Sequence, residues 1–177
     1  DPWERYLAPE KVCPNGERTD LPLAEEASTM VCLLNYARGR RRLGPLRVAP
    51  LLNESSLAKA ERIARCTDFN HDACGVDADR EARASGYWGA WGENLVISPG
   101  RIGAPRPALD AWLNSPDHRE NLFDPQSRTM GLAVRHLDRF FATPPLLVLL
   151  HDPPWHFEVA LADDLRFHLL YATRRTF

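Results

Sequence analysis

The sequence predicts one α+β domain, with helices in its first part and an antiparallel sheet in its last. Apolar residues recur at helical spacing in several segments between Leu23 and Asn114, and the period becomes strand-like from Thr129 onward. A chain of 177 residues with 44% apolar residues can bury one core of ordinary composition. Because the helices precede the strands, we expect helices to cover the sheet.

Residues 1–22 are predicted to form an extended arm on a domain that comprises residues 23–177. The arm contains four prolines and has little apolar periodicity. A loose tail is the competing interpretation for its first few residues. Within the domain, residues 138–165 contain two Pro-Pro pairs and are predicted to form an enlarged connection between strands.

Helices are predicted over residues 23–39, 50–66, 78–84 and 107–114, where proline and glycine mark several of the ends. The arginines at 38 and 40–42 follow the helical pattern of the first segment, and we expect them to be solvated near the helix dipole. Ser115 before Pro116 is typical of a further helix start. There the backbone N–H of His118 would meet the Ser115 hydroxyl.

Strands are predicted over residues 131–137, 146–151, 157–160 and 166–173. Between the helices, Tyr87–Gly92 interleaves aromatic residues with glycines. It is predicted to be a loop that packs over the core or lines a groove, and the following Gly-Glu-Asn is placed in a loop or helix-end context. Residues 98–107 are also predicted to be a loop.

The four cysteines predict disulfides and an oxidising compartment. Four cysteines allow three pairings, and we predict Cys13–Cys32 and Cys66–Cys74. The first would attach the arm to a helix, and the second would lock the loop that carries His71. Four buried free thiols are the alternative.

Charge and hydropathy exclude several partners. The net charge of −2 gives no general attraction for nucleic acid or an anionic membrane. The longest apolar run, residues 146–150, is too short to span a bilayer. The cysteines, together with the abrupt start at Asp1-Pro2-Trp3, lead us to expect a secreted protein, trimmed at its start and monomeric.

His71, Glu93 and His118 are the candidate chemical residues. Two imidazoles and a carboxylate would suit a divalent transition metal such as zinc, with a position open to water. The same trio could serve as a metal-free acid/base pair. Equally, Glu93 could hold backbone N–H groups while the histidines pack beside it. No Gly-x-Ser-x-Gly nucleophile motif, phosphate loop or dinucleotide fingerprint occurs.

Several motifs occur in an order and spacing that resemble one family. They comprise Cys32-Leu33-Leu34-Asn35, Gly44-Pro45-Leu46, His71, Gly86-Tyr87, Gly92-Glu93-Asn94-Leu95, Trp112-Leu113-Asn114-Ser115-Pro116-Asp117-His118-Arg119-Glu120-Asn121-Leu122, Met130-Gly131-Leu132-Ala133 and Leu170-Tyr171-Ala172-Thr173. The sequence thereby resembles the CAP superfamily of cysteine-rich secretory, antigen 5 and pathogenesis-related proteins, and most of all its bacterial secreted SCP-domain branch.

The resemblance implies a three-layer α-β-α sandwich with a central, mostly antiparallel sheet and a groove that carries two histidines and two glutamates. His71, Glu93 and His118 match three of these positions. Ser115 occupies the position of the second glutamate, which leaves one carboxylate for any metal. Four aromatic residues near the trio would line an apolar groove, namely Tyr87, Trp88, Trp91 and Trp112.

Two functions follow as expectations. The resemblance favours a secreted binding module for a small apolar ligand (a lipid or sterol) or for an extracellular protein. The alternative is a metal-dependent peptidase or esterase, in which His71 and His118 hold the metal and Glu93 acts as the base. We favour binding, because the sequence shows no nucleophile and no third certain metal ligand.

Overall fold

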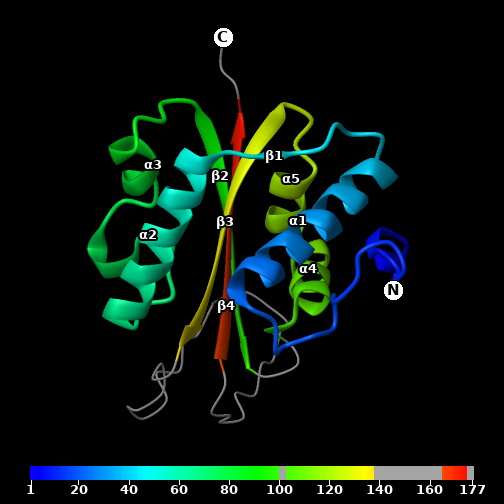
Figure 1. The fold of residues 1–177 in the computed structure, drawn as a ribbon. Helices are drawn as coiled ribbons and strands as arrows, with labels where there is room; N and C mark the ends of the chain where they lie inside the picture. The colour runs from blue at the N-terminus through cyan, green and yellow to red at the C-terminus, as the bar shows by residue number, and fades with distance from the viewer. Residues whose placement is uncertain (100–102, 138–164, 175–177) are drawn as a thin grey trace.

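The computed structural model describes residues 1–99, 103–137 and 165–174, the last segment by its backbone. Its helices lie on both faces of a central sheet, so the described chain has three layers (Figure 1). This arrangement confirms the α+β class. No helix among these residues is both long enough and apolar enough to cross a membrane.

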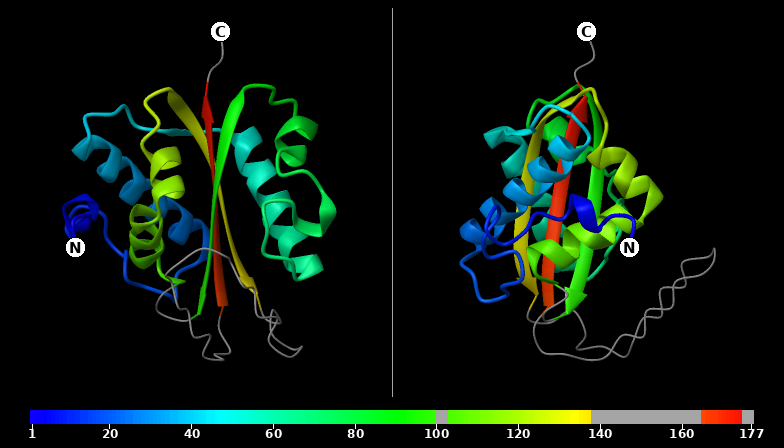
Figure 2. Two further views of the ribbon diagram at one scale, coloured as in Figure 1. Left: turned by 180° about the vertical axis from the view of Figure 1, so that it is seen from behind. Right: turned by 90° about the vertical axis from the view of Figure 1, so that its right-hand side faces the viewer.

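Seven helical segments surround the sheet in the described residues. Helices α2 and α3 cover one face, while α1, α4 and α5 cover the other, as Figure 1 and the left view of Figure 2 show. The segments are η1 Glu4–Tyr6, α1 Leu23–Arg40, α2 Pro50–Cys66, η2 Ala73–Gly75, α3 Arg80–Ala84, α4 Pro105–Asn114 and α5 Pro116–Leu122. The predicted helices all form, with ends within a few residues of the predicted ones.

The sheet has the strand order β1-β3-β4-β2. Its strands are β1 Arg47–Val48, β2 Ala90–Pro99, β3 Ser127–Leu137 and β4 Leu165–Arg174. The short β1 runs parallel to β3, whereas β4 runs antiparallel to both β3 and β2. The sheet is therefore mixed, and β2 forms one of its edges.

Strand β2 corrects the predicted loop around Gly92-Glu93-Asn94. Glycine and asparagine lower local strand propensity, so this segment lacks a clear strand pattern in sequence. Its partner lies far along the chain, and Glu93 pairs with Tyr171 in the register of β2 and β4. Tertiary pairing thus decides its conformation. The predicted strands 146–151 and 157–160, and most of the predicted connection 138–165, lie outside the described residues.

Two apolar cores lie on opposite faces of the sheet. The larger one lies on the side of α1, α4 and α5, where Met30, Leu34 and Leu109 are buried. The smaller one lies against α2 and contains Ala60, Ile63 and Leu95. Consecutive residues of an edge strand can therefore reach different layers of the domain.

The N-terminal residues are part of the larger core. Tyr6, Leu7 and Ala8 are buried there, and the short helix η1 replaces part of the predicted extended arm. Cys13 is joined to Cys32 of α1, as predicted. The loose-tail interpretation therefore fails for residues 6–8.

Arg38 differs from the solvated arginine that we expected. It is buried at the end of α1 and donates hydrogen bonds to the carbonyls of Gly44 (2.9 Å), Leu122 (2.7 Å) and Ser127 (3.3 Å). Five fixed N–H donors allow a guanidinium to satisfy several carbonyls at once. Arg38 thereby ties α1 to the end of α5 and the start of β3, while burial lowers its pKa.

Candidate functional site

The edge strand β2 directs successive side chains to opposite layers. Glu93 and Leu95 face α2, since Leu95 packs with Ala60 and Ile63 of that helix. Asn94 faces the other layer and donates from Nδ2 to the His118 carbonyl at 2.9 Å. Because side chains alternate along a strand, one short segment contacts both helix layers at the edge of the sheet.

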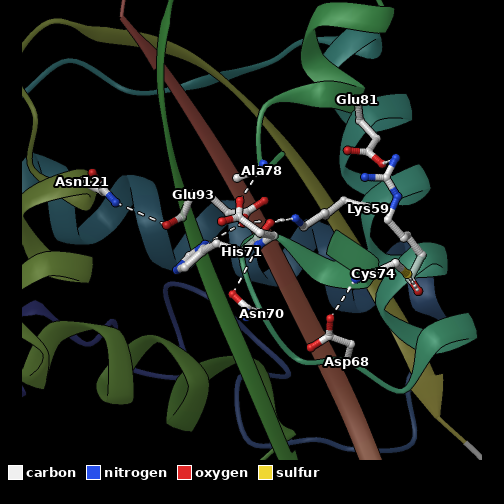
Figure 3. A network of polar contacts seen from close by, with 11 residues as sticks. Lys59, Asp68, Asn70, His71, Cys74, Ala78, Glu81, Glu93 and Asn121 are labelled. Carbon is white, nitrogen blue, oxygen red and sulfur yellow. Dashed lines mark hydrogen bonds and ion pairs between the residues drawn. The ribbon is translucent and has the colours of Figure 1, made fainter. Parts of the chain in front are cut away.

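Glu93 is the centre of a buried polar network. Its Oε1 lies 2.7 Å from Nδ1 of His71 and 3.9 Å from Nζ of Lys59. The side chains of Lys59 and Glu93 are 0% and 1% exposed, whereas that of His71 is 52% exposed. Lys59 also donates to the His71 carbonyl. Figure 3 shows His71 and Lys59 converging on Glu93. The carboxylate is therefore enclosed, and His71 connects it to the surface.

The loop that carries His71 is constrained by covalent and polar contacts. The disulfide Cys66–Cys74 joins the end of α2 to η2, across the loop. The Asp68 carboxylate accepts the N–H of Cys74 at 2.8 Å, and the Asp72 carboxylate accepts the N–H of Ala78 at 3.0 Å. These contacts define the loop from which His71 reaches Glu93, and Figure 3 shows the one between Asp68 and Cys74.

Asn121 of α5 approaches Glu93 from the other side of β2 (Figure 3). Its Nδ2 donates to the Glu93 carbonyl at 3.3 Å and to Oδ1 of Asn94 at 3.0 Å. Gly92 makes this approach possible, because a Cβ there would lie 2.7 Å from Oδ1 of Asn121. The Gly-Glu-Asn segment thus supplies a close approach, a buried carboxylate and a link to α5.

His118 lies in α5 and is partly buried. Burial lowers the pKa of its imidazole, nearby His71 lowers it further, and Asp117 opposes the shift. The predicted cap does not form, since the Ser115 hydroxyl makes no capping hydrogen bond. Ser115 is both the C-cap of α4 and the N-cap of α5. Its carbonyl accepts the N–H of Arg119 at 2.9 Å. Backbone contacts rather than the hydroxyl therefore satisfy this junction.

The described residues do not fit a zinc site. Among them, no group of three or more His, Cys, Asp and Glu side chains is arranged to hold a metal. Oε1 of Glu93 already faces His71 and the cation of Lys59. Oε2 of Glu93 has no hydrogen-bond partner in the described part of the chain, but it belongs to a carboxylate that is enclosed beside the lysine cation. Catalytic zinc sites use three protein ligands around one ion, and the described residues form no such group.

An open hollow of about 520 Å³ lies beside this network. It lies between the end of α1, helix α5 with the loop after it, and the start of β2, and its exposed lining is more polar than apolar. None of the three candidate chemical residues is among the lining residues, but Asn121 is in both sites. The lining consists of Arg41, Trp91, Gly92, Pro116, Arg119, Glu120, Asn121, Phe123, Asp124, Pro125 and Ser127.

Two arginines of the hollow are held over aromatic rings. The guanidinium of Arg41 lies 4.5 Å from the centre of the Phe123 ring, and that of Arg119 lies 4.3 Å from the Trp3 ring. Arg119 also donates to the Leu113 carbonyl at 2.7 Å. Such stacking fixes the position of a charged group that remains near solvent.

The four predicted groove aromatics do not share one environment. Trp91 lines the hollow. Trp112 is 1% exposed within the larger core and donates to the Leu95 carbonyl at 3.1 Å. Trp88 is 75% exposed and lies under Arg83, while Tyr87 is partly buried. Of the four, Trp112 packs the core instead of lining an open surface.

Lys59 is a site residue that our reasoning from sequence missed. It lies on the buried face of α2, with Ser56, Ala60 and Ile63 at helical spacing. A single charged residue on an otherwise uncharged, buried helix face was a readable signal, because an unpaired buried charge is costly. Asn121 gave no comparable signal, since its partners on β2 lie far away in sequence.

Comparisons with known proteins agree on one fold. The CAP profile, described as the cysteine-rich secretory protein family, matches residues 31–141. No curated protein matches the chain. An extracellular protein containing an SCP domain from Bacillus anthracis is similar, with a TM-score of 0.60 and 17% identity over 89% of this chain. This chain covers 45% of that protein, less than half of its length.

Two further solved structures are similar. An outer surface protein from Borrelia burgdorferi gives a TM-score of 0.59 and 15% identity over 88% of this chain and 97% of that one. A cysteine-rich secretory protein from Staphylococcus aureus gives a TM-score of 0.55 and 14% identity over 89% of this chain and 41% of that one. At these identities the likeness establishes the fold.

Proposed function

Because this chain belongs to the CAP family of cysteine-rich secretory proteins, we propose that it is a secreted, non-enzymatic binding module. Its two disulfides are typical of an oxidising compartment. Two of the similar structures are described as extracellular or outer-surface proteins. The occupant that we propose is a segment of an extracellular protein, bound at the hollow beside Asn121.

The composition of the hollow is the observation that carries this proposal. Its lining combines Trp91 and Phe123 with Arg41 and Arg119, and adds the carboxylate of Glu120. Tryptophan, phenylalanine and arginine are enriched in protein interfaces. Both signs of charge are present, so the hollow can pair with acidic and basic side chains of a polypeptide. A lipid or sterol would favour a more apolar and more enclosed site.

The two arginine side chains are preorganised for such a contact. Arg41 and Arg119 stack on Phe123 and Trp3, so less side-chain freedom is lost when a partner binds. The hydrolase alternative receives less support. Glu93 is enclosed beside a buried lysine, and the described residues do not provide three metal ligands.

The test uses tagged protein to capture partners from the extracellular fraction of its source, followed by identification by mass spectrometry. Arg41→Glu and Glu120→Lys reverse charges at the hollow, where both residues are exposed. Glu54→Lys is the matched control, because it reverses an exposed charge on α2 in the other layer. We expect one purified partner to bind wild type and Glu54→Lys alike and to lose at least tenfold in affinity with both hollow variants.

Other outcomes would contradict the proposal. A partner that binds all four proteins equally would not use the hollow. A stoichiometric lipid in organic extracts of the purified protein would favour the apolar-ligand function. Hydrolysis of a peptide or ester that is lost in Glu93→Gln, with folding intact, would favour the enzyme.

A further inference from the structure

We infer that the ammonium group of Lys59 is the resident cation of the His71–Glu93 centre and takes the place that a divalent metal would otherwise occupy. The centre is then a metal-independent network of a lysine, a glutamate and a histidine. This inference goes beyond the proposed binding function, because partner binding at the hollow does not require it.

Burial makes the charge of Lys59 effective. Its side chain is 0% exposed and its Nζ lies 3.9 Å from Oε1 of Glu93, whose side chain is 1% exposed. In an environment with little water, a charge acts on its neighbours far more strongly than at the surface. A buried carboxylate also requires a counter-charge. Lys59 supplies one from within the chain.

The direction of the lysine side chain is fixed by its surroundings. Nζ donates a hydrogen bond to the His71 carbonyl, so it is anchored to the same loop that presents the imidazole. Neighbouring Ala60 and Ile63 on α2 are fully buried. The ammonium therefore has a second contact that holds it beside Glu93.

The position of Lys59 Nζ beside Glu93 also disfavours metal binding to this carboxylate. Zinc binds carboxylate oxygen at about 2.0–2.2 Å, so a zinc ion on Oε1 of Glu93 would lie within about 6 Å of Nζ. Two positive charges at that separation repel strongly in a buried environment. Nδ1 of His71 is also engaged by Oε1. A divalent ion would have to compete with both contacts.

The first experiment is calorimetric titration of Zn²⁺ into the metal-stripped protein. We compare wild type, His71→Ala, Lys59→Met and Lys59→Met combined with His71→Ala. Lys11→Met is the matched control, because Lys11 is exposed and is the only other lysine of the chain. We expect wild type, Lys11→Met and His71→Ala to bind zinc equally weakly. Lys59→Met should bind at least tenfold more tightly, and His71→Ala should abolish that gain.

Two results would overturn the inference. Stoichiometric zinc binding by wild type that is lost in His71→Ala would show a metal site despite the lysine. Zinc affinity in folded Lys59→Met equal to that of wild type would show that the ammonium is not the obstacle. If Lys59→Met does not fold, the wild-type and His71→Ala arms still decide whether the centre holds zinc.

A second experiment tests the enclosure of Lys59 directly. With two lysines in the chain, an amine-acetylating reagent followed by peptide mass spectrometry reports each one separately. We expect Lys59 to react at least tenfold more slowly than Lys11 in the folded protein, and equally fast after denaturation. Equal rates in the folded protein would overturn the inference. Loss of partner binding at the hollow would leave both results unchanged, so the two proposals fail independently.

Discussion

Glu93 and Lys59 form a buried pair in which each charge depends on the other. The carboxylate lies on an edge strand and the ammonium on the helix that covers it, 3.9 Å apart. A buried pair contributes little net stability, but removal of one partner leaves an uncompensated charge. His71 lies beside this pair, and its side chain, 52% exposed, is the member of the network nearest to solvent.

Glu93→Gln should therefore lower the free energy of unfolding by about 3–5 kcal/mol, because Lys59 is left buried without its carboxylate. Urea denaturation followed by circular dichroism measures this change. The double variant Lys59→Met/Glu93→Gln should lose less than the sum of the two single variants. Additive losses would mean that the two side chains do not interact, and Lys11→Met provides an exposed lysine control.

The lowered pKa of His118 leads us to expect that stability depends on pH. Its pKa is lowered in the folded protein, mainly by burial, so the unfolded chain binds the proton more readily. The contribution of neutral His118 to the free energy of unfolding is complete above the ordinary histidine pKa of about 6.5. It is lost as pH falls through the lowered pKa of the folded protein. Unfolding free energies measured from pH 7.5 to 5 should fall in this window, and less so in His118→Gln. An identical slope in the variant would assign the dependence to other groups.

At the scale of elements, the packing of α2 on β3 depends on Gly131. A Cβ at that position would overlap the Leu52 carbonyl in the first turn of α2. Asn53 reinforces the contact, since its Oδ1 accepts the N–H of Leu132 at 2.9 Å. The helix therefore lies close enough to the strand to exclude any side chain at Gly131.

Gly131→Ala should destabilise the protein by about 1–3 kcal/mol, since neither the helix nor the strand can move without disrupting its neighbours. Gly39→Ala is the matched control, because a Cβ there meets no atom within 4 Å and the residue lies inside α1. It should stabilise by about 0.5–1 kcal/mol. Thermal denaturation of both variants would reveal the opposite signs, and equal effects would contradict the close approach.

Prediction from sequence succeeded for helices and failed where elements have distant partners. Periodicity and proline positions located α1 and α2 almost to the residue, because helical contacts are local. They missed β1, and they missed β2 because the partner of Glu93 on β4 is Tyr171. For the same reason, Lys59 and Asn121 were absent from the predicted site. Only the helical spacing on α2 indicated that Lys59 lies on a buried face.

At the scale of the whole molecule, the N-terminal residues complete the core on the side of α1. The Tyr6 ring lies 5.5 Å from that of Phe123, and Arg106 of α4 bonds to Glu4 at 2.8 Å. The Cys13–Cys32 disulfide attaches the same segment to α1. Phe123 also lines the hollow, so these residues support the surface on which the proposed partner binds.

Deletion of residues 1–8 should lower the free energy of unfolding by at least about 3 kcal/mol, because it removes buried Tyr6 and Leu7. Chemical denaturation of the shortened protein, with both disulfides intact, measures the loss. Deletion of Asp1 and Pro2 alone is the control, since both are exposed and it should cost little. Equal stability of all three proteins would show that the segment is a tail.

The sequence by itself determined the α+β class, the helices and the family, because these depend on local spacing and on motifs that can be read along the chain. It also predicted the two disulfide pairs, which the structure confirms. Tertiary structure alone decided that Gly92–Asn94 belongs to an edge strand, that Lys59 faces Glu93, and that the hollow forms between α1, α5 and β2. These features depend on contacts between segments separated by tens of residues, and the geometry of such contacts is fixed only when the layers pack together.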